Sequence, residues 1–183
     1  MAGFTPFRKE GGATQGEMRA FIIENSATIT LGDMVDVTAG FAGLAGAGTR
    51  VMGCVVGLVR DIGQGSPVAL GTDAASGFTG SRTGNAGSIG SDTYAAASDN
   101  ETVDKVMAYV VIDPKMEYYN DADGSLAQAQ IGTYYDLLAA SDQIDQSTTT
   151  TYSAQMVLMA IDPFNDGDAS KGIFRVVEHQ LTA

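Results

Sequence analysis

Short hydrophobic runs separated by turn residues recur along the chain from residue 19 onward. The first three runs are 20–24, 28–31 and 34–38, and Asn25-Ser26 and Gly32-Asp33 lie between them. Runs of this length with turn chemistry at their ends predict a meander of short β-strands. The next run, 51–59, is apolar on both alternating faces, which predicts a strand that is buried on both sides.

The second half of the chain is patterned in the same way. Its runs are 105–112, 116–119, 133–138, 155–161 and 172–179, and residues 126–130 predict one helical turn. Two of the runs end in Asp-Pro, at Asp113-Pro114 and Asp162-Pro163. Because proline cannot donate to a β-ladder, we expect both strands to leave the same barrel rim into loops. The chain is thus predicted to be mainly β, a partly closed β-barrel or sandwich of short antiparallel strands.

Two segments fall outside this pattern. Residues 1–18 contain Gly11-Gly12, Pro6 and small polar residues, which predicts an extended N-terminal arm with Phe4 and Phe7 as its anchors. Deleting this arm is expected to leave the fold intact. Residues 62–102 are rich in Gly and Ser, which predicts a long loop that either contacts a neighbouring molecule or stays mobile. Residues 19–183 are expected to form a single β domain.

Charge and cysteine content narrow the class of protein. The chain has 22 acidic and 10 basic residues, a formal net charge of -12, which disfavours binding to nucleic acid. Cys54 is the only cysteine, so there is no disulfide framework, and a lone thiol in an apolar run suits a reducing compartment. The first ten residues lack the apolar stretch of a secretory signal, and no apolar run is long enough to span a membrane, so neither secretion nor membrane insertion is expected.

The sequence offers little reactive chemistry. The glycine-rich segment 43–48 does not match a dinucleotide-binding fingerprint. The aspartates around Gly124 and Gly167 fail the register of a calcium-binding loop and are interpreted as turn formers. His179 is the only histidine and is interpreted as structural or interfacial. We therefore expect no catalytic residue, no metal site, no cofactor and no enzymatic activity.

The aromatic residues are the candidates for contact with another protein. Tyr118-Tyr119 and Tyr134-Tyr135 each place one ring on either face of a strand, so one ring of each pair is core and the other faces outward. Outward aromatic rings are either interface residues or ordinary half-buried sheet residues. The predicted contact residues, for self-association or for a larger assembly, are Phe4, Phe7, Arg8, Tyr118 and Tyr134.

The order of these elements resembles the capsid decoration, or cement, proteins of tailed bacteriophages. The resemblance rests on short motifs within residues 19–181: Gly32-Asp33-Met34-Val35, Gly53-Cys54-Val55-Val56-Gly57, 108–114, 123–126 with Ile131-Gly132, 147–151 and 174–180. It implies a β-rich virion protein that binds the major capsid protein on the outside of the shell, often as a trimer, and fastens capsomers together without catalysis.

Taken together, the sequence predicts a structural protein of the virion, located on the capsid surface and made in the host cytoplasm. It is expected to form a homo-oligomer, with a trimer favoured, and to bind neither nucleic acid nor membrane. The alternatives are another virion component, such as a head-tail or fibre protein, and a small-ligand-binding β-barrel.

Overall fold

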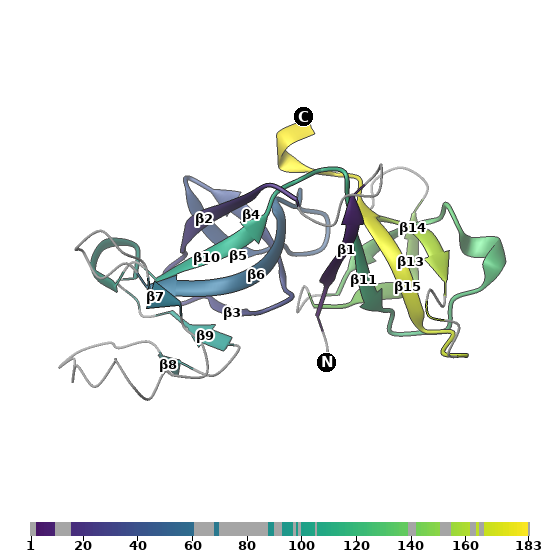
Figure 1. Ribbon diagram of the computed structural model, residues 1–183, viewed down its shortest axis with the longest axis horizontal. Helices are drawn as coiled ribbons and strands as arrows, with labels where there is room; N and C mark the ends of the chain where they lie inside the picture. The colour runs from purple at the N-terminus through teal and green to yellow at the C-terminus, as the bar shows by residue number, and fades with distance from the viewer. Residues whose placement is uncertain are drawn as a thin grey trace.

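The computed structural model describes most of the chain and is mainly β (Figure 1). The described residues are 3–9, 16–60, 68–69, 88–89, 93–96, 98, 100–104, 106–138, 142–150, 155–161, 164 and 167–182. Most of the predicted Gly/Ser-rich loop, residues 62–102, lies outside them, as do Asp162 and Pro163. The described residues form fifteen strands in three sheets, so the predicted mainly β class is confirmed.

The first sheet is a closed five-stranded barrel. Its strands follow the order β10-β2-β5-β4-β6, and β6 pairs with β10 to close the ring. All neighbours are antiparallel except β2 and β5, which run parallel. The short strand β7 (Val68–Ala69) extends β6. The barrel strands are β2 (Met18–Ile23), β4 (Met34–Thr38), β5 (Phe41–Leu44), β6 (Gly53–Arg60) and β10 (Val106–Val111).

The barrel interior is filled by side chains. Alternate residues of β10, namely Val106, Ala108 and Val110, point into it and are fully buried. A small third sheet of β3 (Thr28–Thr30), β9 (Thr93–Ala95) and β8 (Ser88–Ile89) packs Ile29 and Tyr94 into the same core. The π-helix η1 (Asn100–Asp104) follows β9 and leads to β10.

The second sheet contains six antiparallel strands in the order β1-β11-β15-β14-β12-β13. Its inner face carries the other hydrophobic core, which includes Tyr118, Tyr135 and Phe174. The 3-10 helix η2 (Gln128–Gln130) confirms the predicted helical turn, and η3 (Gln180–Thr182) follows the last strand. The strands are β1 (Thr5–Lys9), β11 (Met116–Asp121), β12 (Tyr134–Leu137), β13 (Ile144–Thr150), β14 (Met156–Ile161) and β15 (Lys171–Val176).

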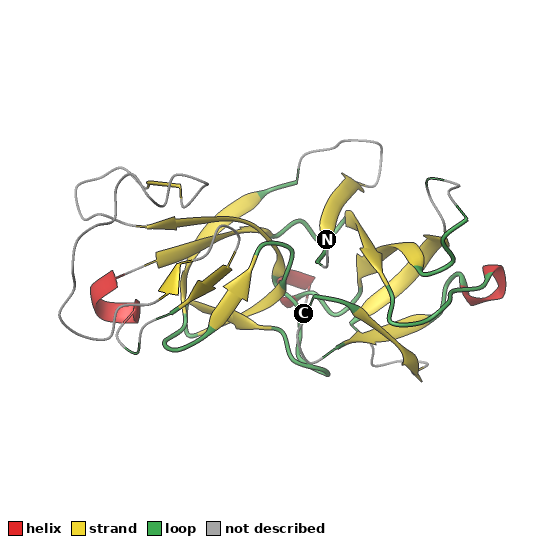
Figure 2. Cartoon of the chain, turned by 90° about the horizontal axis from the view of Figure 1, so that it is seen from below, coloured by secondary structure: helices red, strands yellow, loops and turns green. Residues whose placement is uncertain are grey.

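The barrel and the second sheet lie side by side, and both ends of the chain lie between them (Figures 1 and 2). Their contact is part of one core, because Met34, Val51 and Cys54 of the barrel half cluster with the core of the second sheet. The strand predicted at 51–59 is buried on both sides except at Val56, which is 36% exposed: Cys54 faces the shared core, and Val55 packs in the barrel.

Two glutamine side chains fasten the barrel to the second sheet. The Gln155 amide donates to the carbonyls of Gly46 and Thr49, both at 2.7 Å, and accepts from the Leu137 N–H at 2.9 Å. Gln180 accepts from the Val37 N–H at 2.8 Å. Because Gln155 is fully buried, its satisfied hydrogen bonds fix the two halves in one arrangement.

Two sequence predictions about topology are wrong. The first is the meander within residues 20–38: β3 pairs with β9 in the third sheet, and β5 lies between β2 and β4 in the barrel. Second, the strands that precede Asp113-Pro114 and Asp162-Pro163 were expected to leave the same barrel rim, but β10 belongs to the barrel and β14 to the second sheet. An Asp-Pro pair ends a strand for local reasons, namely a missing N–H and a fixed backbone angle. Such a pair carries no information about the sheet to which the strand belongs.

The described parts of the predicted arm are residues 3–9 and 16–18, and both contribute to sheets: residues 5–9 form β1 of the second sheet, and Met18 is the first residue of the barrel strand β2. The strand β1 pairs with β11 in the register Thr5↔Tyr119, and Phe4 is only 2% exposed in the shared core. The Phe4 carbonyl also accepts from the Cys54 thiol, at 3.2 Å. We therefore revise the expectation that deletion of residues 1–18 leaves the fold intact, since that deletion removes a core side chain and an edge strand.

Candidate functional site

The five predicted contact residues fall into three places. Phe4 and Tyr118 lie in the core, with their rings edge to face and 6.4 Å apart, so their side chains are not on the surface. Phe7 and Arg8 lie on β1 at the outer face of the second sheet. Tyr134 is half-buried on β12, and three strands separate it from β1 in the sheet.

In each tyrosine pair one ring is buried and the other reaches the surface, as predicted, but the buried ring is the first residue of one pair and the second residue of the other. Tyr135 is buried and Tyr134 reaches the surface, whereas Tyr118 is buried and Tyr119 reaches the surface. The outward ring of the first pair is thus Tyr119 and not the predicted Tyr118. Alternation follows from the strand geometry, but the face that becomes core is set by the neighbouring strands β1 and β15.

The outward ring of Tyr119 belongs to an aromatic patch that also contains Phe7 and Phe164. The Phe164 ring lies 5.0 Å from the Tyr119 ring and 6.1 Å from the Phe7 ring, both in edge-to-face arrangements. Phe164 is 56% exposed, the most exposed phenylalanine in the described chain. Aromatic rings that reach the surface next to a charged rim are typical of protein interaction sites.

Sequence reasoning missed Phe164 as a contact residue. The residue stands alone in a turn after β14, and its partners on β1 and β11 lie more than 40 residues away in the chain. The only local signal was its place directly after Asp162-Pro163, where an apolar side chain has no strand in which to be buried.

The Arg8 guanidinium borders the aromatic patch. Its Nε lies 2.6 Å from Glu117 Oε2, and its Cζ lies 5.7 Å from the centre of the Phe7 ring. The Glu117 side chain is 8% exposed and the Arg8 side chain 54%. The buried carboxylate and the ring therefore hold one side of the guanidinium, while the other side is open to solvent.

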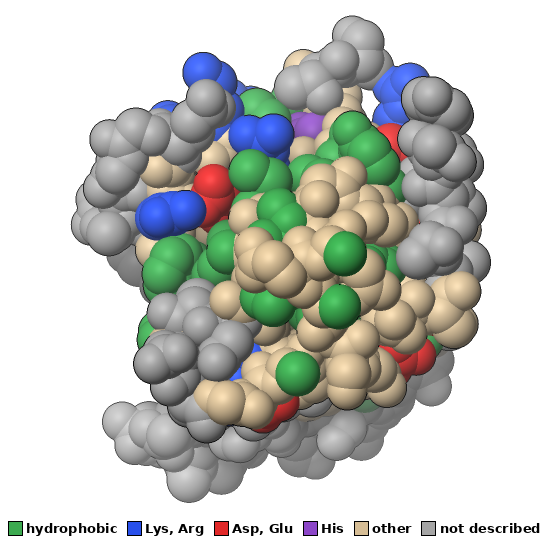
Figure 3. Space-filling view, turned by 90° about the vertical axis from the view of Figure 1, so that its right-hand side faces the viewer, with side chains coloured by type: hydrophobic (Ala, Val, Ile, Leu, Met, Phe, Trp, Pro, Cys, Tyr) green, Lys and Arg blue, Asp and Glu red, His purple; other side chains and the backbone are tan. Residues whose placement is uncertain are grey.

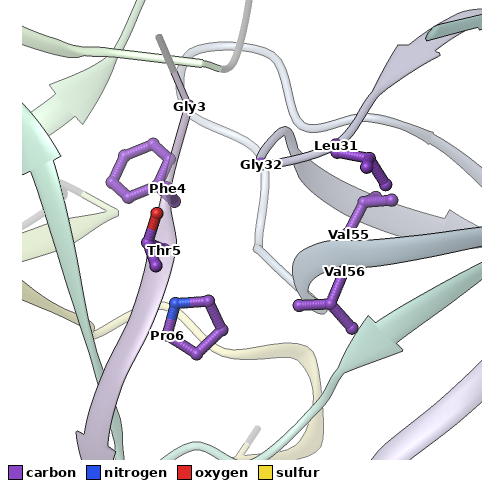
Figure 4. Close-up of a pocket in the computed structure, with 8 residues that line it drawn as sticks. All are labelled: Gly3, Phe4, Thr5, Pro6, Leu31, Gly32, Val55 and Val56. Atoms are coloured by element: carbon purple, nitrogen blue, oxygen red, sulfur yellow. The ribbon is translucent and has the colours of Figure 1, made fainter. Parts of the chain in front are cut away.

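A shallow apolar pocket of about 180 Å³ lies between β1 and the barrel (Figure 4). Among the described residues no titratable side chain lines it, so its described walls offer no acid or base to a bound molecule. One wall is formed by the start of β1, and the other is formed by the β3–β4 turn together with β6. The lining residues are Gly3, Phe4, Thr5, Pro6, Leu31, Gly32, Val55 and Val56.

The edge of β1 that faces this pocket is poorly suited to strand addition. The Phe4 N–H already donates to the Gly32 carbonyl at 2.8 Å. Two residues further along the strand, on the same edge, stands Pro6, which has no N–H. Natural sheets protect exposed edges with proline in this way. The outer face of the second sheet, and not its edge, is therefore the available interaction surface near β1.

The junction between barrel and second sheet carries an unusual carboxyl group. Asp33 is buried and accepts from the Thr30 N–H at 2.7 Å. Burial raises the pKa of Asp33 to about 6, the Thr30 hydrogen bond opposes this rise, and the nearby Asp142 carboxylate adds to it.

This pKa makes the stability of the fold depend on pH. Since the pKa of Asp33 is higher in the folded than in the unfolded chain, ionisation of Asp33 costs stability, and this cost develops as pH rises from about 4 to 6. We expect Asp33→Asn to remove a cost on the order of 2 kcal/mol at pH 7.5 and less at pH 5. Urea unfolding of both proteins at the two pH values measures the difference, and an equal effect at both would contradict the assignment.

The other singled-out groups have structural roles. His179 is buried, forms a β-bridge with Val51, and its Nδ1 accepts from the Leu181 N–H at 3.0 Å. Asp123 accepts from the Gln146 N–H, and Asp168 from the Ser170 N–H and hydroxyl. Within the described residues no group of three or more His, Cys, Asp or Glu side chains could hold a metal ion, and no helix could span a membrane.

The fold and the patch define a β-barrel protein with a second β-sheet and an aromatic surface on that sheet. Comparisons with protein-family models, with curated proteins and with solved structures found no match to this chain. Its function is therefore inferred from its own residues and their geometry.

Proposed function

We propose that this protein is a structural component of a tailed-bacteriophage virion that binds the major capsid protein on the outer surface of the shell. The observation that carries the proposal is the aromatic patch of Phe7, Tyr119 and Phe164, which exposes apolar area on a rigid sheet. The sequence resemblance to capsid decoration proteins supports the same role. The proposed role is non-enzymatic, with the patch as a contact surface and no site for turnover.

Rigidity of the scaffold also supports a bracing role. The barrel and the second sheet share one core, and the buried Gln155 joins them through two hydrogen bonds to the barrel half and one to β12 of the second sheet. A protein that bridges capsomers adds contact area that must be lost before the shell opens, so its binding stabilises the closed shell. That stabilisation is transmitted only if the bridging protein does not itself deform.

A homotrimer is the assembly that we favour, in line with the resemblance. A trimer presents three copies of the aromatic patch to a shell with many identical sites. Simultaneous engagement then converts weak single contacts into a stable attachment. Light scattering of the purified protein measures the oligomer number directly.

The packed barrel favours this proposal over a small-ligand-binding barrel. Side chains such as Ile23, Val55 and Val110 fill the barrel interior and are at most 1% exposed. The pocket beside β1 lies outside the barrel. A head-tail or fibre protein stays the second candidate, and it differs in where the protein lies on the virion.

The central test is binding to expanded shells that lack this protein. We expect wild type to cosediment with such shells and Phe164→Ala to bind at least about tenfold more weakly, the loss typical of an exposed aromatic hot spot. Ile131→Ala is the matched control, because Ile131 is also exposed, at 40%, but leads from η2 into β12, which β15 and β14 separate from β11 in the sheet. This control should bind like wild type.

The same particles distinguish a capsid decoration protein from a head-tail or fibre protein. Image reconstruction of saturated shells is expected to show the protein repeated over the capsid surface. Density confined to one vertex would favour a head-tail component instead. Absence of any shell binding by the folded wild-type protein would refute the decoration role.

A further inference from the structure

Arg8 is held in place before any partner arrives. Its Nε contacts Glu117 Oε2 at 2.6 Å, and Glu117 is almost fully buried, so this end of the guanidinium is anchored to the sheet. Phe7 lies below the guanidinium, with 5.7 Å between Cζ and the ring centre. An arginine with both contacts loses little side-chain freedom when it binds a further group.

The two terminal nitrogens of Arg8 remain for another acceptor. Within the described residues, the only hydrogen bond of the Arg8 side chain is made by Nε. The side chain is 54% exposed, so solvent reaches it. A guanidinium binds a carboxylate through two parallel N–H···O bonds, and the pair of terminal nitrogens has this geometry.

The charge around Arg8 differs from that of the rest of the chain. The three adjacent strands β1, β11 and β15 carry four basic and two acidic residues, whereas the whole chain has a net charge of -12. Three of the four bases already pair with an acid: Arg8 with Glu117, Lys9 with Asp113 and Lys171 with Asp168. Figure 3 shows Lys and Arg side chains next to hydrophobic ones on the face at the second-sheet end. An acidic partner is therefore repelled less here than by the acidic surface of the rest of the molecule.

We propose that Arg8 anchors a carboxylate of the partner protein. The partner segment carries an Asp or Glu next to an apolar side chain: the carboxylate pairs with the terminal nitrogens of Arg8, and the apolar side chain packs on Phe7, Tyr119 and Phe164. This inference rests on the proposed function, and it specifies the chemistry of the shell surface that the patch recognises.

A short peptide tests this chemistry without the shell. The probes are acetyl-Asp-Leu-Phe-amide and its Asn counterpart, titrated into the labelled full-length protein and followed by NMR. We expect the Asp peptide to shift the Arg8 Nε–Hε and Phe164 ring signals, with an affinity at least about tenfold higher than that of the Asn peptide. Equal affinities of the two peptides, or no shift at these signals, would overturn the proposal.

Two single variants distinguish a direct contact between Arg8 and the peptide carboxylate from an effect of the protein's overall charge. Arg8→Gln is expected to abolish the preference for the Asp peptide. Arg19→Gln is the matched control, since Arg19 also pairs with a glutamate, Glu17, at 2.9 Å and is 62% exposed, but lies on the barrel. The control should retain the full preference, and its loss there would mean that overall charge and not Arg8 is responsible.

Loss of Arg8 leaves the buried Glu117 unpaired, so a second variant guards against misfolding. The double variant Arg8→Gln/Glu117→Gln removes both charges and is expected to keep the thermal midpoint near that of wild type while losing the Asp preference. A double variant that folds and still prefers the Asp peptide would refute the role of Arg8. Shell binding by wild type is measured separately, so the two failures can be distinguished: failure of the peptide test alone contradicts the role of Arg8 and leaves the decoration role standing, whereas failure of shell binding contradicts the decoration role itself.

Discussion

Gly53→Ala is expected to lower the free energy of unfolding by about 4 kcal/mol or more, a large part of the total stability of a typical domain. A Cβ atom at this position would lie 1.8 Å from the Val111 carbonyl oxygen and 2.8 Å from its carbon. These are backbone atoms of β10, the strand that closes the barrel with β6. The clash can be relieved only by separating the two strands. Urea unfolding followed by circular dichroism measures the effect.

Gly46→Ala is the control for this substitution. A Cβ at Gly46 would meet nothing within 4 Å, although Gly46 also lies near the junction and accepts a hydrogen bond through its carbonyl. We expect its stability to stay within about 0.5 kcal/mol of wild type. A Gly53→Ala protein as stable as this control would mean that the close approach of β6 and β10 is not a feature of the folded chain.

Phe4→Ala is expected to cost about 3–5 kcal/mol, the range for removal of a fully buried aromatic side chain. Phe4 packs edge to face on Tyr118 in the core that the barrel and the second sheet share. Its removal leaves a cavity at the junction and loosens β1. The thermal midpoint and the urea midpoint of the variant both report this loss.

Phe7→Ala tests whether the stability lost in Phe4→Ala comes from the buried Phe4 side chain or from disturbance of the strand β1 as a whole. Phe7 also lies on β1, but it is only half-buried and belongs to the aromatic patch. Its truncation is expected to cost less than half as much as that of Phe4, because less apolar area returns to water. Similar costs for the two variants would show that β1 as a whole, and not the Phe4 side chain, supplies the stability.

Local pattern was sufficient to predict most strands. The run 51–59 was predicted to be buried on both sides, and Cys54 and Val55 are buried against different cores. A strand of this kind is visible in sequence because both of its faces are apolar. The alternation of Tyr134 and Tyr135 was likewise visible, since it follows from the two-residue repeat of any strand.

Long-range pairing could not be predicted. β1 has too few apolar residues to be recognised as a strand, and its partner Tyr119 lies more than 100 residues from Thr5. For the same reason the outward ring of the Tyr118-Tyr119 pair was assigned to the wrong residue. The aromatic patch is assembled from three distant segments, so its members cannot be found together by any local pattern.

The pairing of β1 with β11 has a consequence for how the chain folds. The second sheet is formed by residues 116–176 together with a strand from residues 5–9, so it is complete only after the barrel segment between them has been placed. Closing such a large loop costs conformational entropy before β1 and β11 make any stabilising contact. Proteins dominated by β pairing between sequence-distant residues fold in milliseconds to seconds. Phe4 therefore docks late, and substitution of Phe4 should accelerate unfolding far more than it slows refolding.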